Sequence, residues 1–397
     1  MNSSDCVPAL PDAQSPNVCL DHPTAAECYL IWGLTSLAWR DALTRSSYLE
    51  ESAYLTSVPL AKDGGMTLWI LVDKNLTPGQ RPILCSCETF RKHTLISDTE
   101  GNVKKVILHG VASVFCNPEY RGRGYGRQMM RELAEVLQTW QTETVKCVGS
   151  VLYSDIGKTY YARLGWHALS HNTTIGFHPL VASAPLVARK VLDGDLDHLC
   201  DEDEAMIRKA MADRSKAKRT MMVLPDQDHM RWHHKKAEFA CEKLFEKQPK
   251  IKGAIAGQPG NRIWVIWMHR YYGDPEPEFS SNTLYILRLV IEDQLALGTF
   301  SLDKRDLPHE AGQSELQVHN LKAVLQSAQS EAAEWRLPSV KIWNPTPLVL
   351  RLIERTQIKH WKEEREHEGI TSLLWYGDGS DSENAPEFMG NEKYAWC

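Results

Sequence analysis

The chain has 397 residues, of which 43% are hydrophobic and 24% are charged. At about 150 residues per domain, this length predicts two to three domains, and the composition excludes a disordered, collagen-like or coiled-coil protein. Since 45 Lys and Arg stand against 51 Asp and Glu, the formal net charge is −6. No strong positive field therefore exists to hold nucleic acid or an anionic membrane.

The sequence carries no sign of export or membrane insertion. No apolar run reaches the ~18 residues that a membrane span needs, and residues 1–21 lack the basic and apolar segments of a secretory signal. The ten cysteines fit neither a disulfide framework nor a zinc site, so buried free thiols are expected. We therefore expect a soluble, cytoplasmic protein without a metal.

The first half of the chain alternates apolar runs with amphipathic segments. A flexible arm over residues 1–17 precedes a helix that begins after Thr24, where Glu27 completes a capping box. A long amphipathic helix follows residue 126, with one apolar stripe at helical spacing. Strands are predicted at Met66–Asp73, Ile83–Phe90, Val106–Cys116 and Lys146–Tyr153, and a short helix at Thr159–Leu164.

The second half, from residue 180, shows a similar order of elements, which indicates an internal structural duplication without a visible residue-level repeat. The final strand is expected to close the second copy. The predicted helices are Leu196–Met211, Met230–Lys247, Leu316–Arg336 and Leu348–Thr356, and the strands are Arg262–Tyr271, Thr283–Ile291, Val340–Trp343 and Ile370–Tyr376.

The strongest motif runs from Arg121 to Gly126 (RGRGYG), between a strand and a helix. Glycines let consecutive backbone N–H groups face one concavity, and the helix N-terminus adds about half a positive charge, so the loop predicts a pyrophosphate site. A Rossmann fingerprint would come earlier in a βαβ unit, and a Walker loop would need Gly-Lys-Ser/Thr. A Gly-rich hairpin loop is the remaining alternative.

Two motifs resemble the GNAT acetyltransferase superfamily. Arg121–Gly126 fits its [Q/R]-x-x-G-x-[G/A] acetyl-CoA motif, and Tyr160–Trp166 (YYARLGW) is similar to its Y-x-x-x-G-F helix. The resemblance implies an α/β fold with a mixed sheet, in which residues 18–179 bind acetyl-CoA. Residues 180–397 would then be a degenerate GNAT-like domain that closes the substrate cleft, because Asp306–Gln313 stands where a second phosphate loop would lie.

A narrower resemblance, to the fungal lysine N6-acetyltransferase family, covers nearly the whole chain. It rests on Ser86–Thr89, Ala112–Phe115, Ser150–Gly157 and the ending Asn391–Cys397 (NEKYAWC). It implies transfer of acetyl from acetyl-CoA to the side-chain amine of free lysine, the opening step of lysine degradation. A protein lysine acetyltransferase and a non-catalytic acetyl-CoA-binding regulator remain alternatives.

The superfamily pattern also implies roles for particular residues. Pantetheine would contact the backbone groups of Val114, Phe115 and Cys116. Pyrophosphate would bind the loop of Arg121, Gly122, Arg123, Gly124, Tyr125 and Gly126. The Tyr161 phenol would protonate the departing thiolate. The alternative for Tyr161 is packing against pantetheine alone.

A base is needed because an ammonium must lose its proton before it attacks. Glu88 ranks first, since a charge inside an apolar strand needs a partner or a substrate. Asp155, after a strand, ranks second, and His109 third. Glu88 could equally pair with a structural Arg or Lys.

Two other clusters are assigned to structure. His229, His233 and His234 are predicted to lie on a solvated helix face rather than to bind a metal. The tryptophans of the second half most simply build its core, although one or two could wall a pocket for an alkyl-ammonium chain. We further expect one acetyl-CoA per chain, lysine between the halves, and an ordered tail at Asn391–Cys397.

Overall fold

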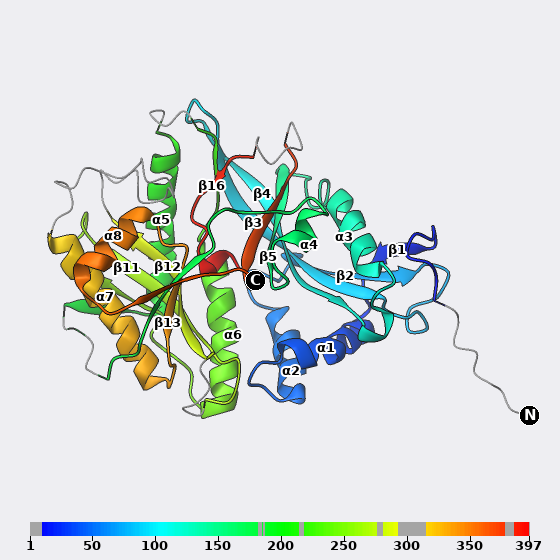
Figure 1. Cartoon of the computed structure of the whole chain (residues 1–397), viewed down its shortest axis with the longest axis horizontal. Coiled ribbons are helices and arrows are strands. Elements are labelled where there is room, and N and C mark those ends of the chain that lie inside the picture. Colours follow the sequence, from blue (N-terminus) through cyan, green and yellow to red (C-terminus); the bar gives the residue numbers. More distant parts are fainter. Residues whose placement is uncertain are drawn as a thin grey trace, which may run out of the picture.

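A computed structural model describes residues 10–181, 185, 187–213, 218–275, 281–292, 315–377 and 385–396. Two mixed sheets lie side by side, with helix α6 (Gln227–Phe245) and the C-terminal end of the chain at their junction (Figure 1). Within these residues, no helix is both long and apolar enough to cross a membrane.

The first sheet has the strand order β1-β2-β3-β4-β5-β15-β6, and β9 pairs with both β3 and β16 beside this path. Helices α1 (Ala25–Trp39), α2 (Arg45–Leu55), α3 (Tyr125–Val136) and α4 (Thr159–Ala162) belong to this part, with a 3-10 turn at Pro118–Tyr120. Its strands are β1 (Val18–Asp21), β2 (Met66–Asp73), β3 (Cys85–Ser97), β4 (Val103–Cys116), β5 (Cys147–Ser154), β6 (His167–Ala168), β9 (Thr220–Val223), β15 (Ile370–Trp375) and β16 (Glu387–Phe388).

The second sheet has the order β14-β7-β13-β12-β11-β10-β8. Helices α5 (Leu196–Met211), α7 (Glu315–Glu334) and α8 (Pro347–Thr356) accompany it, with 3-10 turns at Asp193–Asp195 and, as η8, at Lys393–Ala395. Its strands are β7 (Thr173–Phe177), β8 (Ala188–Val191), β10 (Gly253–Ala256), β11 (Ile263–Arg270), β12 (Thr283–Ile291), β13 (Val340–Trp343) and β14 (Trp361–Glu364).

Each half of the chain inserts a strand between two strands of the other sheet. β7 follows the first-half strand β6 in sequence but lies between β13 and β14, and β15 follows β14 but lies between β5 and β6. In both sheets the inserted strand is antiparallel to its two neighbours. The expectation that the final strand closes the second copy was therefore wrong, and the division at residue 179 does not separate the two sheets.

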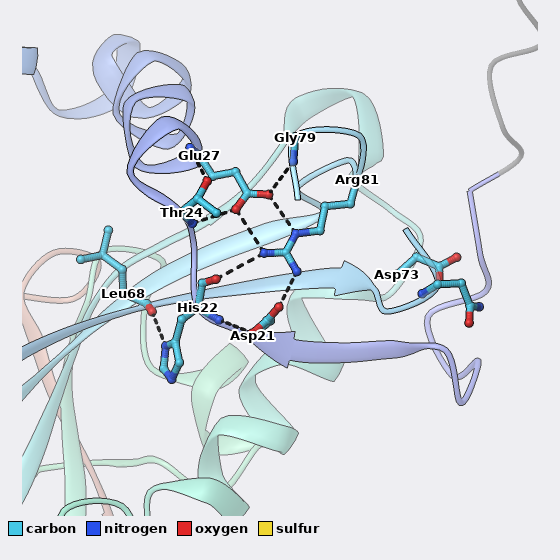
Figure 2. A network of polar contacts seen from close by, with 9 residues as sticks. Asp21, His22, Thr24, Glu27, Leu68, Asp73, Gly79 and Arg81 are labelled. Atoms are coloured by element: carbon cyan, nitrogen blue, oxygen red, sulfur yellow. Dashed lines mark hydrogen bonds and ion pairs between the residues drawn. The ribbon is translucent and has the colours of Figure 1, made fainter. Parts of the chain in front are cut away.

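A buried ion-pair network fixes the start of α1 (Figure 2). Thr24 and Glu27 form the predicted capping box, and the Glu27 carboxylate also accepts from the Arg81 guanidinium at 2.8 Å and 3.1 Å. Arg81 reaches back to the Asp21 carboxylate and the His22 carbonyl at the end of β1. These bonds hold the pKa of Glu27 at about 2, so they tie α1 to the sheet at neutral pH.

The N-terminal segment differs from the flexible arm that we expected. Residues 1–9 lie outside the described residues, but Ala13 is buried in the core under α3, and the Tyr125 hydroxyl donates to the Pro11 carbonyl. Residues 10–17 therefore pack beside the start of α3, because burying Ala13 and Leu10 there removes apolar surface from water.

A fragment that ends at Pro179 would lack β15, so the outer edge of β5 would lose its neighbour and β7 its sheet. We expect this fragment to show no cooperative thermal transition by circular dichroism, because unpaired strand edges are left open. Coexpression with residues 180–397 should restore a folded complex. A fragment that unfolds cooperatively on its own would contradict the exchange.

Candidate active site

Strands β4 and β5 run parallel and then separate. Their pairing ends at Val111 and Leu152, although β4 continues to Cys116 and β5 to Ser154. Beyond that point, β4 stays paired with β3, and its residues change from buried to half-buried. An opening therefore lies between the two strands where pantetheine was expected to insert, beside Val114, Phe115 and Cys116.

The glycine loop follows directly after this opening. Gly122 and Gly124 have φ angles of 79° and 89°, a region that side chains disfavour. A Cβ atom built on Gly122 meets nothing within 4 Å, and residues 121–124 are exposed. The loop opens α3 with backbone N–H groups that donate to no capping side chain among the described residues, so it fits the pyrophosphate of a nucleotide cofactor.

Two predicted loop residues are placed differently from the glycines. The Arg121 Nε–H donates to the Cys116 carbonyl at 3.1 Å and its guanidinium lies over the Phe115 ring, so this cation covers the end of β4. The Tyr125 side chain is buried in the core and turned away from the loop. The exposed Arg123 is the other loop cation available to phosphate.

Tyr161 lies on the α3 side of the sheet, beside the opening. It belongs to the same core cluster as Val111 and Leu152, the last paired residues of β4 and β5. Within the described residues its hydroxyl makes no hydrogen bond, and burial raises its pKa. The phenol therefore keeps its proton at neutral pH and has that proton free to donate.

Glu88 lies on the opposite face, in a small cavity between β3 and helices α1 and α2. Trp32, Trp39 and Tyr48 form its aromatic walls. The Glu88 Oε2 accepts from the Ser113 hydroxyl at 2.9 Å, and burial raises the pKa of this carboxyl. A carboxylate that is poised in a small aromatic pocket is suited to accept a proton from a bound cation.

Ser113 is a site residue that the sequence analysis missed. Its φ of 53° is a left-handed value on a residue with a side chain, at the bulge where β3 and β4 lose register. This conformation turns its hydroxyl toward Glu88. No local sequence signal marks such a bulge, because an ordinary strand would accept the same residue.

The other two candidate bases lie in structural positions. Asp155 is exposed after β5, and its Oδ1 accepts the Gly369 N–H at 2.9 Å, which ties β5 to the loop before β15. His109 is fully buried, contacts Gln141 at 3.3 Å and Cys147 at 3.4 Å, and has its pKa lowered to about 4 by burial. Neither lines the Glu88 cavity.

The histidines of α6 are not solvated, so that prediction was wrong. All three are buried, because α6 contacts α2, β11 and η8 at the junction of the halves. His233 and His234 each bond to a backbone carbonyl at 3.0 Å, those of Tyr394 and Trp267. In the described part of the chain, no three His, Cys, Asp or Glu side chains gather as a metal site would require.

The second sheet has a comparable opening, which the chain itself fills. β12 and β13 pair only from Leu284 to Ile286, and beyond this point the Leu289 N–H donates to the Glu392 carboxylate at 2.9 Å. Tyr394 is fully buried alongside. The tail was expected to be ordered, and residues 391–396 confirm this, whereas Cys397 and Asp306–Gln313 lie outside the described residues.

A strand opening, a glycine loop at a helix N-terminus and a buried tyrosine define a GNAT-type acetyltransferase, and family comparison agrees. The acetyltransferase (GNAT) domain model matches residues 89–168. The model described as the LYC1 GNAT-like C-terminal domain matches residues 178–397, more than half of the chain. The chain belongs to this family. The predicted fold, tandem GNAT-like domains in a mixed α/β architecture, is confirmed, and membership implies use of acetyl-CoA.

Two curated relatives are similar to the chain at low identity. A protein named lysine acetyltransferase from Yarrowia lipolytica is 22% identical over 365 residues, which cover 79% of this chain and 84% of the relative. An uncharacterized protein of Saccharomyces cerevisiae is 22% identical over 303 residues, which cover 64% and 74%. The likeness to a lysine acetyltransferase is therefore distant.

One solved structure resembles the fold across both halves. A protein of unknown function from Enterococcus faecalis, described as a probable N-acyltransferase, superimposes with a TM-score of 0.51 at 11% identity. The match covers 90% of this chain and 72% of that chain. At this identity, the likeness shows the fold alone.

The glycine loop can be tested without backbone strain at Gly126, whose φ is not left-handed. Gly126→Glu should lower acetyl-CoA affinity about 10²-fold or more by calorimetry, because a carboxylate would face pyrophosphate at the helix N-terminus. Gly126→Ala is the matched control, since its Cβ meets only the movable Tyr160 hydroxyl at 3.3 Å. Gly124→Glu should also abolish binding, but its φ of 89° adds strain. Unchanged affinity in folded Gly126→Glu would remove the loop from the site.

Tyr161→Phe should lower kcat about 10²-fold, the usual size of a general-acid contribution, with little change in acetyl-CoA affinity. Tyr160→Phe is the matched control, because its half-exposed ring packs against Tyr161 at 5.0 Å but points toward Gly126. A larger loss in Tyr160→Phe than in Tyr161→Phe would assign the proton donor to the neighbouring residue.

Proposed function

We propose that this protein transfers acetyl from acetyl-CoA directly to the side-chain amine of free L-lysine, or of a related small amine, in a ternary complex. The observation that carries the proposal is the position of Glu88 and Tyr161 on opposite faces of the sheet at the opening between β4 and β5. The name of the Yarrowia lipolytica relative supports lysine as the acceptor. The cytoplasm is the compartment we propose for the reaction.

Glu88 would remove the proton from the acceptor. A lysine side chain has an ordinary pKa near 10.4, so it enters as an ammonium. Between the Trp32 and Trp39 rings the cation is partly desolvated, which favours its neutral form. The raised pKa of Glu88 brings the two groups closer in proton affinity, so transfer from ammonium to carboxylate costs less than in water.

The cavity suits a slender aliphatic amine. The space between the Trp32, Trp39 and Tyr48 rings is narrow. Aromatic faces stabilise a cation before it loses its proton, and they contact methylene groups afterwards. A bulky acceptor would have to displace Trp32 or Tyr48, both of which are buried.

On the other face, Tyr161 would complete the exchange of protons. Bound acetyl-CoA supplies the activated acyl group. The neutral amine would attack the acetyl carbonyl and form the carbon–nitrogen bond, the carbon–sulfur bond would break, and Tyr161 would give its phenolic proton to the departing thiolate. The attacking nitrogen would release its second proton to solvent, and solvent would reprotonate the Tyr161 phenolate, so that the protons balance. The two faces thus hold the two proton carriers apart, so the base does not neutralise the acid before transfer.

Glu88→Gln should lower kcat/KM for lysine about 10²-fold or more and remove the acid limb of its pH profile. Ser113→Ala is the diagnostic partner. The Ser113 hydrogen bond lowers the Glu88 pKa, so its loss raises that pKa, and the acid limb should move to higher pH with full activity retained above it. An unmoved acid limb in Ser113→Ala would exclude Glu88 as the titrating base.

The acceptor itself is tested by thiol release from acetyl-CoA with free amino acids, polyamines and histone peptides. We expect turnover with L-lysine or a similar small amine. Turnover with peptides alone would favour a protein lysine acetyltransferase. Acetyl-CoA binding without turnover on any of these amines would favour a regulator.

A further inference from the structure

Three cationic side chains meet at the junction of the two sheets, and we call them the cationic cluster: Arg270, Arg365 and Lys393. Arg270 ends β11, Arg365 follows β14, and Lys393 begins η8. The C-terminal end of the chain lies at this junction in Figure 1. The mechanism proposed above uses none of them.

Lys393 is the most deeply buried member, with 3% of its surface exposed. Its Nζ lies 3.6 Å from the ring centre of Trp396, 4.0 Å from that of Trp343 and 4.8 Å from that of Tyr285. Aromatic faces attract a cation, but they carry no negative charge to neutralise it. Among the described residues, no carboxylate and no hydrogen-bond acceptor lies within bonding distance of the Lys393 Nζ, although the more distant Asp155 and Asp41 carboxylates act to raise its pKa.

The two guanidinium groups share the same rings. Arg365 lies 4.0 Å from the centre of Trp343, and Arg270 lies 5.7 Å from that of Trp396. Each of these tryptophans therefore contacts two cations. Trp343 was predicted to build the core or to wall a pocket for an alkyl-ammonium chain; here it lies against cations of the protein itself.

The charges of the cluster do not balance. Arg270 forms an ion pair with Asp41 at 2.5 Å, the one carboxylate that any of the three reaches in the described part of the chain. The side chain of Arg365 donates to three neutral oxygens of described residues, at 2.8 to 3.4 Å. The Nε–H groups of Arg270 and Arg365 are buried without an acceptor. An excess of buried positive charge is costly unless an anion enters.

The ionisation of the cluster responds to this imbalance. Burial, the charge of Arg270 and that of Arg365 lower the pKa of Lys393 well below its usual range, and burial lowers the pKa of Arg365 to about 10. A bound anion would raise the pKa of both side chains again, because it attracts their positive charge, and the same attraction would stabilise the bound anion.

The cluster adjoins the acceptor face of the opening. The Trp343 ring lies 6.4 Å from that of Tyr153, in the part of β5 that has left β4. Asp41, the partner of Arg270, stands two residues after Trp39, which lines the Glu88 cavity. An anion at the cluster would therefore lie on the same side of the first sheet as an amine at Glu88.

We propose that the cationic cluster binds the carboxylate of an amino-acid acceptor and thereby selects free amino acids over polyamines and peptides. This rests on the proposed function, since the acceptor amine must reach Glu88. An amino acid with a terminal side-chain amine carries both groups at the two ends of an aliphatic chain. The guanidinium forks and the ammonium supply several donors to one carboxylate in a site that aromatic rings keep dry.

The test compares L-lysine with L-lysinamide, in which a neutral amide replaces the carboxylate. Wild-type kcat/KM should favour lysine about 10²-fold. Lys393→Met should lower kcat/KM for lysine about 10- to 10²-fold, mainly through KM, and leave lysinamide within about threefold, as expected for loss of one charge-assisted contact. Equal use of both acceptors by the wild type, or an equal loss for both in Lys393→Met, would overturn the proposal.

Folding provides an independent readout. Lys393→Met removes an unpaired buried charge and keeps an apolar chain among the rings, so its Tm should be equal to or above that of the wild type. Lys341→Met is the matched control, because Lys341 is half-buried on the neighbouring strand β13 and makes no ion pair with any described residue. This control should leave both acceptors unaffected. A large fall in Tm for Lys393→Met would instead assign Lys393 a structural role.

Calorimetry separates this proposal from the proposed function. If the wild type acetylates neither acceptor, the proposed function fails. The affinity for lysine then tests by itself whether the cationic cluster binds a carboxylate. We expect L-lysine to bind the wild type and to bind Lys393→Met at least about tenfold more weakly, with lysinamide weak in both. If polyamines are acetylated but lysine neither reacts nor binds, the enzyme class stands and the carboxylate site falls.

Discussion

The separation of β5 from β4 is the constraint on which the rest of the molecule depends, and it is possible because β5 has a second neighbour. Beyond Leu152 the strand has left β4, yet Tyr153 and Ser154 remain paired with Thr371 and Ile370 of β15. Buried backbone groups must find partners, so an opening without β15 would leave both edges of β5 unpaired. The strand that allows the opening comes from the far end of the chain. The two halves are therefore parts of one folding unit, although each has its own sheet.

Several elements could be predicted from local pattern because their apolar residues follow a continuous or helical spacing. The apolar runs Met66–Asp73, Thr283–Ile291 and Val340–Trp343 form strands with these bounds, and Leu196–Met211 forms the predicted helix. Strand neighbours could not be predicted in the same way. An apolar strand such as β15 packs equally well in either sheet by its own composition, and tertiary contacts decide which one takes it. The α6 histidines were misassigned for a related reason, since their spacing does not reveal that both halves cover the helix.

The candidate site could be predicted where a single residue type departs from what its local structure normally contains. Glycines at 122 and 124 mark a loop that needs left-handed backbone, and Glu88 marks a charge inside an apolar strand. The roles that the resemblance gave to the loop and to Tyr161 stay predictions until they are tested. The cationic cluster follows the same logic as Glu88, because Lys393 stands between acidic and aromatic residues of a buried tail. Its partners come from strands that are distant in sequence, so no linear spacing could reveal the group.

The tail residues 391–396 connect the two openings of the molecule. Glu392 accepts the Leu289 N–H in the second opening and pairs with Arg288, so a carboxylate of the chain occupies a backbone donor there. The adjacent Lys393 turns the other way, into the aromatic rings at the junction. One short segment thus fills the second opening and places a basic side chain against the aromatic rings at the junction of the sheets. The filling of the second opening by Glu392 and the burial of Lys393 are therefore two consequences of how residues 391–396 pack.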